Sequence, residues 1–204
     1  MDKRILITIG RQFGSGGKCI ADAMGRILGV PVYDNELITR AAQKSGLSAD
    51  VFRKSDERRR FSLPGGLLGS LRYGSYTRNV LGDSELYRYQ SEAILDLASQ
   101  GSAVFVGRAS DYVLREQPVF NVFITAPLEA RKARVAERKA VSLEEAEQLI
   151  HKMDARRKDF YDLITLGDNW GIASRYHLCV DSSLLGEDGT AQLIVDVALK
   201  SGRF

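Results

Sequence analysis

The feature that most constrains the fold of this chain is a glycine-rich loop between a strand pattern and a helix pattern. The stretch ITIGRQFGSGGKCIADAMG, residues 7 to 25, places five glycines between β-branched residues and apolar residues at helical spacing. Glycine lets consecutive backbone N–H groups converge on phosphate oxygens at a helix N-terminus. We therefore predict a phosphate-binding loop formed by Gly14, Ser15, Gly16 and Gly17, with Lys18 reaching the terminal phosphates. The alternative is a turn that only permits close packing.

The spacing of this loop departs from the usual phosphate-loop pattern. The pattern requires a glycine six residues before Lys18, where this chain has Gln12, and Gly10 lies eight residues before the lysine. Cys19 stands where a serine or threonine would contact magnesium, and a soft thiol is a poor ligand for that hard ion. The sequence therefore predicts phosphate binding without a magnesium ligand at position 19, and it identifies no other metal ligand.

Five short apolar runs predict the strands of a parallel sheet. They are ILITI (5–9), PVYD (31–34), AVFV (103–106), VFNVFIT (119–125) and HLCVD (177–181). Near-continuous hydrophobicity is typical of strands buried on both faces, and helical patterns lie between these runs. Ser142 with Glu145 predicts a capping box at the start of one such helix. We expect an α/β doubly wound domain whose ligand lies beyond the carboxyl ends of the strands.

Length and composition indicate one ordinary globular domain over residues 1–204. No apolar run approaches the roughly 20 residues that would span a bilayer, and the N-terminal stretch lacks a signal-peptide pattern, so we expect a cytoplasmic protein that binds no membrane. Two cysteines are too few for a disulfide framework. A net charge of +3 does not favour nucleic acid, so small phosphorylated ligands are the expected partners.

One segment, residues 53–79, breaks the alternation of strands and helices. It mixes a basic run with Pro, Gly, Ser and Tyr, and no period dominates. We interpret it as a mobile insertion on the acceptor side. Two roles are consistent with this composition: a solvated linker, or a segment that covers the substrate or contacts another subunit. The second role would allow the protein to form a homo-oligomer.

The chain resembles the cytidylate kinase-like family of P-loop nucleoside monophosphate kinases. The resemblance is carried, in this order, by ITIGRQFGSGGKCIA, LGVPVYDNELITRAA, VFVGRASDYVL and ARRKDFYDLITLGDNWGIASRYHLCVDSSLLG. It implies a P-loop NTPase fold with a five-stranded parallel core and a helical lid at about residues 140–172. It also implies ATP and Mg²⁺ as cofactors, with ATP bound at Gly14, Ser15, Gly16, Gly17, Lys18 and Cys19.

On the acceptor side, the resemblance implies substrate-binding roles for Asp34, Arg40, Arg108 and Asp111. An arginine offers a planar fork for a phosphate, and a carboxylate accepts from sugar or base groups. Arg108 follows a buried strand and so emerges at the ligand-binding edge, while Ala109 replaces the family's acidic residue and Asp111 lies two positions later. The alternatives are that Asp34 caps a surface helix and that Arg108 is an ordinary surface arginine.

Two further groups of arginines lie on helical patterns. Arg131, Arg134 and Arg138 share one face, which we interpret as solvated or paired with Glu137. Arg156 and Arg157 resemble the lid arginines that close over the transferring phosphoryl group, where they neutralise its charge. The nearby aromatic residues Tyr161, Trp170 and Tyr176 are interpreted as packing residues of the lid or its base.

These observations support one leading function and two alternatives. The leading function is transfer of the γ-phosphoryl group of ATP to a nucleoside monophosphate, most of all CMP or dCMP, with Lys18, Arg108, Arg156 and Arg157 as catalytic residues. The second is a P-loop kinase of another small metabolite. The third is a nucleotide-binding regulatory protein without catalysis, which the shifted loop favours and the retained Lys18 and arginines oppose.

Overall fold

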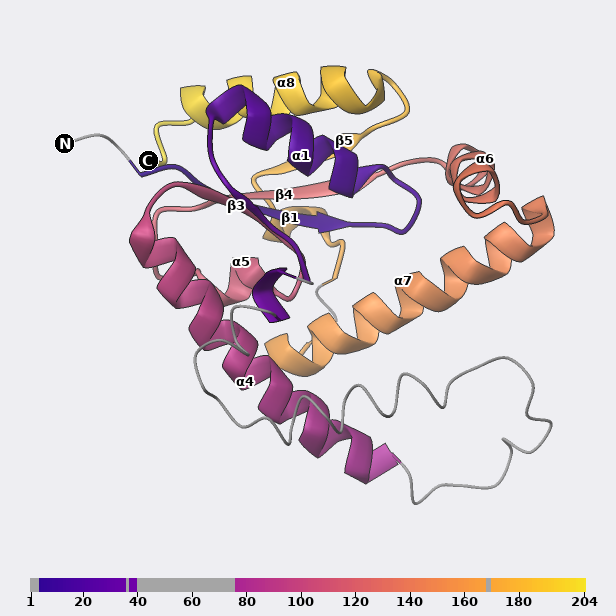
Figure 1. Ribbon diagram of the computed structural model, residues 1–204, viewed down its shortest axis with the longest axis horizontal. Coiled ribbons are helices and arrows are strands. Elements are labelled where there is room, and N and C mark those ends of the chain that lie inside the picture. Colours follow the sequence, from indigo (N-terminus) through magenta and orange to yellow (C-terminus); the bar gives the residue numbers. More distant parts are fainter. Residues whose placement is uncertain (1–3, 36, 40–75, 168–169) are drawn as a thin grey trace.

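The computed structural model describes residues 4–35, 37–39, 76–167 and 170–204. At its centre lies a parallel five-stranded sheet with the strand order β2-β3-β1-β4-β5 (Figure 1). The strands are β1 (Leu6–Arg11), β2 (Val32–Tyr33), β3 (Ala103–Val106), β4 (Phe120–Thr125) and β5 (Leu178–Asp181). All five predicted strands are confirmed with small shifts at their ends, and every pairing between them is parallel.

Helices cover both faces of this sheet, as predicted for a doubly wound domain (Figure 1). Helices α1 (Gly17–Leu28) and α8 (Gly186–Lys200) cover one face, and α4 (Tyr76–Gln100) with the short α5 (Ser110–Val113) covers the other. Helices α6 (Leu128–Lys139) and α7 (Leu143–Thr165) project from one side, and a 3₁₀ turn, η2 (Ala173–Arg175), precedes β5. Of the described helices, none is both long and apolar enough to cross a membrane.

The core consists of two apolar layers, one on each face of the sheet. Because side chains alternate along a strand, Ile7 and Ile9 of β1 face α1 and α8, whereas Leu6 faces the opposite layer. The first layer is completed by Met24 of α1 and Ile194 of α8. Burial on both faces of the central strands explains the near-continuous hydrophobic runs from which the sheet was predicted.

Helix α7 begins at the predicted capping box. The Ser142 hydroxyl accepts a hydrogen bond from the Glu145 backbone N–H at 3.1 Å, and the Glu145 carboxylate accepts from the Ser142 N–H at 2.9 Å. Together these bonds satisfy two N–H groups that the first turn of a helix leaves unpaired. The start of the long helix that carries Arg156 and Arg157 is therefore fixed by local sequence.

The predicted insertion over 53–79 falls mostly outside the described residues. Residues 76–79 are described, and they form the first turn of α4.

Candidate functional site

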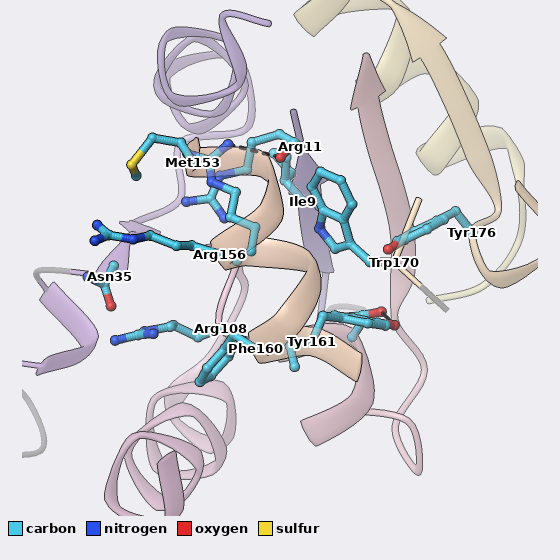
Figure 2. Close-up of a pocket in the computed structure, with 15 residues that line it drawn as sticks. Ile9, Arg11, Asn35, Arg108, Met153, Arg156, Phe160, Tyr161, Trp170 and Tyr176 are labelled. Carbon is cyan, nitrogen blue, oxygen red and sulfur yellow. Dashed lines mark hydrogen bonds between the residues drawn. The ribbon is translucent and has the colours of Figure 1, made fainter. Parts of the chain in front are cut away.

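A cavity of about 360 Å³ opens at the carboxyl ends of β1 and β3, beside the lid helix α7. Figure 2 shows Arg108 and Arg156 reaching toward Asn35, while Trp170 and Tyr176 lie at the opposite side. The lining residues that carry charge or an aromatic ring are Arg11, Arg108, Asp111, Arg156, Arg157, Phe160, Tyr161, Trp170 and Tyr176. Four arginines and one carboxylate in this set make the cavity strongly electropositive, which suits a phosphorylated ligand.

The backbone that presents Arg108 adopts a strained conformation. Gly107, Arg108 and Ala109 follow β3 with φ angles of 76°, 60° and 50°, which is the left-handed region. A residue with a side chain costs about 1 to 2 kcal/mol there, and such strain is concentrated at functional sites. The guanidinium carbon of Arg108 lies 4.9 Å from the centre of the Phe160 ring of α7. The turn thus directs Arg108 into the cavity, where the aromatic ring of the lid helix orients it.

The two lid arginines lie on α7 but differ in their surroundings. Arg156 is exposed and borders the cavity with no contact that would hold it in place in the structure described. Arg157 is partly buried: its Nη1 donates to the Arg11 carbonyl at 3.0 Å, and its guanidinium lies 5.4 Å from the Phe13 ring centre. Arg157 therefore attaches α7 to the end of β1, whereas Arg156 has an exposed side chain at the border of the cavity.

Arg11 is a cavity residue that the sequence reasoning missed. It is the last residue of β1, the central strand, so its side chain emerges at the same edge as Arg108. Desolvation lowers the pKa of the Arg11 guanidinium below its ordinary value, and the neighbouring charges of Arg157 and Arg108 lower it further. The criterion that identified Arg108, an arginine directly after a buried strand, would also have identified Arg11.

The far end of the cavity combines a buried carboxylate with phenol groups. The Tyr161 hydroxyl donates to the Asp111 carboxylate at 2.5 Å, and the Tyr176 hydroxyl accepts from the Gly171 N–H at 3.5 Å. Burial raises the pKa of Asp111, and desolvation together with Asp111 raises the pKa of Tyr161. Tyr161 and Tyr176 are buried packing residues, as predicted, and with Trp170 they also form this wall. This end offers polar groups and flat apolar faces to a ligand.

The glycine loop lies between β1 and α1, directly beside the cavity. Gly16 is the N-cap of α1 with a φ of 79°, a conformation that strongly favours glycine. Ser15 is buried, and its carbonyl accepts a hydrogen bond from the Ser182 hydroxyl at 2.6 Å. The loop is therefore held against the start of the β5–α8 connection, with the N-terminus of α1 at its end, in the arrangement that binds phosphate.

The side chain of Lys18 is paired with two carboxylates. Its Nζ lies 2.8 Å from the Asp22 carboxylate and 3.2 Å from the Asp34 carboxylate, and the lysine is not among the lining residues. Asp34 also accepts a hydrogen bond from the Leu37 N–H at 3.1 Å, which is the helix-capping contact given above as the alternative to a substrate-binding role. Cys19 faces elsewhere, because Arg138 donates to its sulfur at 3.4 Å.

The interpretation of Arg131, Arg134 and Arg138 as solvated or paired with Glu137 was wrong. Arg131 is buried and lies 2.6 Å from Asp154 of α7, and Arg134 donates to the Gly14 carbonyl at 2.6 Å. Arg138 lies 2.6 Å from Glu187 of α8. The physical reason is that α6 packs against the glycine loop, so Arg131 and Arg134 meet a carboxylate and a loop carbonyl, while the exposed Arg138 pairs with Glu187 rather than with Glu137.

The predicted site residues thus divide into two neighbouring groups. Arg108, Asp111, Arg156 and Arg157 share the cavity, and Gly14, Ser15, Gly16, Gly17, Lys18 and Cys19 form the adjoining loop and helix start. Asp34 joins the second group through Lys18, whereas Arg40 lies outside the described residues.

The described residues do not provide a ready site for magnesium. In the part that the structure describes, no three His, Cys, Asp or Glu side chains gather closely enough to hold a metal ion. The carboxylates beside the loop, Asp22 and Asp34, both pair with Lys18. These residues do not fit a protein-held metal ion.

A parallel sheet with a glycine loop leading into α1, next to an arginine-lined cavity under a helical lid, defines a P-loop kinase fold. The sequence model of the cytidylate kinase-like family matches residues 6–184, and the chain belongs to this family. Membership supports kinase activity toward a nucleotide or another small metabolite, and it implies ATP and usually Mg²⁺ as cofactors.

Known proteins with similar sequences carry the same family name. The cytidylate kinase of Methanopyrus kandleri is 26% identical over 93% of this chain and 91% of its own length. The cytidylate kinase of Aeropyrum pernix is 27% identical over 93% of this chain and 96% of its own length.

Solved structures show the same fold. An uncharacterized protein from Eubacterium ventriosum has a TM-score of 0.73 and 23% identity, and the match covers 96% of this chain and 98% of that one. Shikimate kinase from Acinetobacter baumannii, in complex with shikimate, has a TM-score of 0.54 and 13% identity, covering 98% and 96% of the two chains. At these identities the likeness concerns the fold alone.

Proposed function

We propose that this protein transfers the γ-phosphoryl group of ATP to a nucleoside monophosphate, with CMP or dCMP as the preferred acceptor. The observation that carries the proposal is the cavity of about 360 Å³ into which Arg11, Arg108, Arg156 and Arg157 converge beside the glycine loop. Four guanidinium groups in one cavity repel one another unless an anion of high charge lies among them. A donor polyphosphate that meets an acceptor phosphate is such an anion.

The donor phosphates are proposed to bind at the glycine loop. The backbone N–H groups from Gly14 to Gly17 lie at the N-terminus of α1, and Lys18 and Cys19 continue the helix. Lys18 remains a predicted phosphate contact, although its ammonium group must first break its ion pairs with Asp22 and Asp34 to reach a ligand. The loop is braced by Ser182, so its N–H groups are held in place before the nucleotide arrives.

The acceptor is proposed to occupy the rest of the cavity. Arg108, on its left-handed turn, offers its planar fork to the acceptor phosphate. Asp111, with the phenols of Tyr161 and Tyr176, would then face the sugar or base at the other end. Preference for cytosine is supported by the family and by the names of the relatives, and Arg40 remains a predicted acceptor residue.

Catalysis in this proposal consists of positioning and charge neutralisation. The acceptor phosphate is itself a nucleophile, so no covalent enzyme intermediate is needed. Arg156 would move onto the transferring group when α7 closes, and Arg157 would keep α7 aligned with β1 through the Arg11 carbonyl. Closure would also exclude water, which competes with the acceptor.

One observation favours the second candidate, a kinase of another small metabolite. Ala109 occupies the position of the acidic residue in the family's Gly-Arg-Asp element, so the acceptor side of this chain differs from the family pattern. The cavity wall formed by Asp111, Trp170 and Tyr176 would then recognise a different hydroxylated or aromatic compound.

A screen of acceptors separates these candidates. ADP formation from ATP is measured with each common nucleoside monophosphate and deoxynucleoside monophosphate, and then with phosphorylated and unphosphorylated small metabolites. Turnover with CMP or dCMP above all others supports the proposal, and turnover only with a non-nucleotide supports the second candidate. ATP binding with no turnover on any acceptor indicates the non-catalytic alternative.

A further inference from the structure

The geometry points to Arg11, rather than Lys18, as the cation that bridges the donor and acceptor phosphates during transfer. This inference rests on the proposed function and deepens it, because it names the residue that takes the role of the P-loop lysine. In the P-loop pattern, a lysine directly follows the last glycine of the loop. In this chain the last loop glycine in the left-handed conformation is Gly16, and the residue that follows it, the first of α1, is Gly17.

The side chain of Arg11 occupies the space that a side chain at position 17 would need. A methyl group on Gly17 would lie 2.9 Å from both Cβ and Cγ of Arg11, which is closer than such atoms approach. The far end of the same side chain lies over Gly107, where a methyl group would lie 2.8 Å from the guanidinium carbon. Arg11 thus runs from the start of α1 to the turn that carries Arg108. This path joins the donor loop to the acceptor cavity.

The guanidinium of Arg11 is available to a ligand. Within the described part of the chain, it makes no hydrogen bond or ion pair with another protein group, while its backbone carbonyl is held by Arg157. The charges of Arg108 and Arg157 stand nearby, and the one carboxylate that affects it electrostatically is Asp34. A bound polyphosphate would therefore accept hydrogen bonds from the Arg11 guanidinium and reduce its electrostatic repulsion from Arg108 and Arg157.

Lys18 has the opposite surroundings. Its side chain is half exposed and pairs with two carboxylates, Asp22 and Asp34. Successive residues of an α-helix differ in direction by about 100°, so a side chain at position 18 does not follow the path open to one at position 17. Lys18 is the second residue of α1, one position after Gly17, and this offset places it off the phosphate path, which Arg11 from the preceding strand fills.

The chemical step needs such a cation between the two substrates. An oxygen of the acceptor phosphate forms a bond to the γ-phosphorus while the bond from that phosphorus to the β–γ bridging oxygen breaks. ADP leaves with the electron pair of the broken bond, and a dianionic acceptor has no proton to lose. Arg11 would donate to the oxygens of the transferring group, on which charge is spread in the transition state.

The test removes the Arg11 side chain and then places a lysine at position 17. Arg11→Gln keeps much of the side chain's packing, and Arg11→Gly clears the space beside position 17; each should lower kcat on the order of 10²- to 10³-fold with ATP and the best acceptor. The double variant Arg11→Gly/Gly17→Lys should regain activity over Arg11→Gly/Gly17→Ala, because a lysine then follows the loop directly. Lys18→Ala should lose less than Arg11→Gln, and Arg26→Ala, a surface arginine of α1, should match wild type.

Two results would overturn the inference. One is an Arg11→Gln protein that is folded by circular dichroism and keeps wild-type kcat. The other is a Gly17→Lys double variant no more active than its Gly17→Ala control.

A binding measurement separates failure of this inference from failure of the proposed function. If wild type transfers phosphate to no acceptor, the proposed function fails, and calorimetric titration with ATP and ADP still tests Arg11. Arg11→Gln should lower the affinity for ATP more than that for ADP, because the difference between the ligands is the γ-phosphate. An unchanged preference for ATP over ADP in that variant would overturn the role of Arg11 whatever the activity.

Discussion

Replacing Asp154 by alanine should destabilise the protein strongly, because this one carboxylate of α7 connects that helix to both the glycine loop and α6. It accepts hydrogen bonds from the Phe13 N–H and from Arg131 of α6, each at 2.6 Å. The side chains of Arg131 and Asp154 are only 10% and 16% exposed. Val135, Ile150 and Phe13 pack together in the same small apolar cluster.

The expected cost follows from what the substitution leaves unpaired. Breaking a buried ion pair by removing one partner costs about 3 to 5 kcal/mol, and an unsatisfied N–H adds about 1 kcal/mol or more. Residual exposure and the remaining bond from Arg131 to the Phe13 carbonyl, at 3.3 Å, reduce this sum. We expect the free energy of unfolding to fall by about 2 to 4 kcal/mol, which lowers Tm by roughly 4 to 16 °C.

Urea unfolding followed by circular dichroism measures this loss, and the fluorescence of Trp170, the sole tryptophan, reports on the cavity wall. Asp159→Ala on the exposed face of the same helix is the control and should stay within about 0.5 kcal/mol of wild type. The double variant Arg131→Met/Asp154→Leu should recover part of the loss, because no buried charge then lacks a partner. An Asp154→Ala protein as stable as the Asp159→Ala protein would refute this reasoning.

Three further predictions concern the cavity. Arg108→Ala should raise the acceptor KM at least tenfold, which corresponds to a loss of about 1.4 kcal/mol of binding free energy. The affinity for ATP, measured by calorimetry, should stay nearly unchanged, and a loss of ATP binding would contradict the acceptor role of Arg108. Arg156→Ala should lower kcat without changing stability, whereas Arg157→Ala should lower both, since Arg157 bonds to β1; urea unfolding beside steady-state kinetics tests this difference. Burial raises the folded-state pKa of Asp111 above 3.8, so its stabilising contribution is full below pH 3.8 and is lost as pH rises through the raised pKa. The unfolding free energy of wild type relative to Asp111→Asn should therefore fall from mildly acid to neutral pH, and a rise in urea titrations would contradict the shift.

The sheet and the arginine cavity could be predicted from sequence because each depends on a strong local pattern. Central parallel strands bury both faces, so runs such as AVFV and VFNVFIT mark them without alternation. Arg108 follows such a run, and parallel strands end at one common edge, so its place beside the glycine loop follows from topology. Arg11 satisfies the same rule, but it was missed because this stretch was interpreted only through its glycines and Lys18.

The direction of Lys18 and the burial of Arg131 could not be predicted in this way. Whether a side chain meets the phosphate path depends on which residue begins α1, and a shift of one residue rotates it by about 100°. The burial of Arg131 depends on α6 and α7 packing against Phe13, a contact between segments far apart in sequence. Helical spacing alone showed that Arg131, Arg134 and Arg138 share a face and did not show what covers it.

The destination of the γ-phosphoryl group tests the central claim most directly. The protein is incubated with ATP labelled at the γ-phosphorus and with CMP, and the products are separated by chromatography. We expect the label to appear as the β-phosphate of CDP in an amount equal to the ADP formed, and we expect Arg108→Ala to reduce this transfer when CMP is limiting. Label found only as inorganic phosphate, or ATP bound and returned unchanged with every nucleoside monophosphate, would contradict this claim.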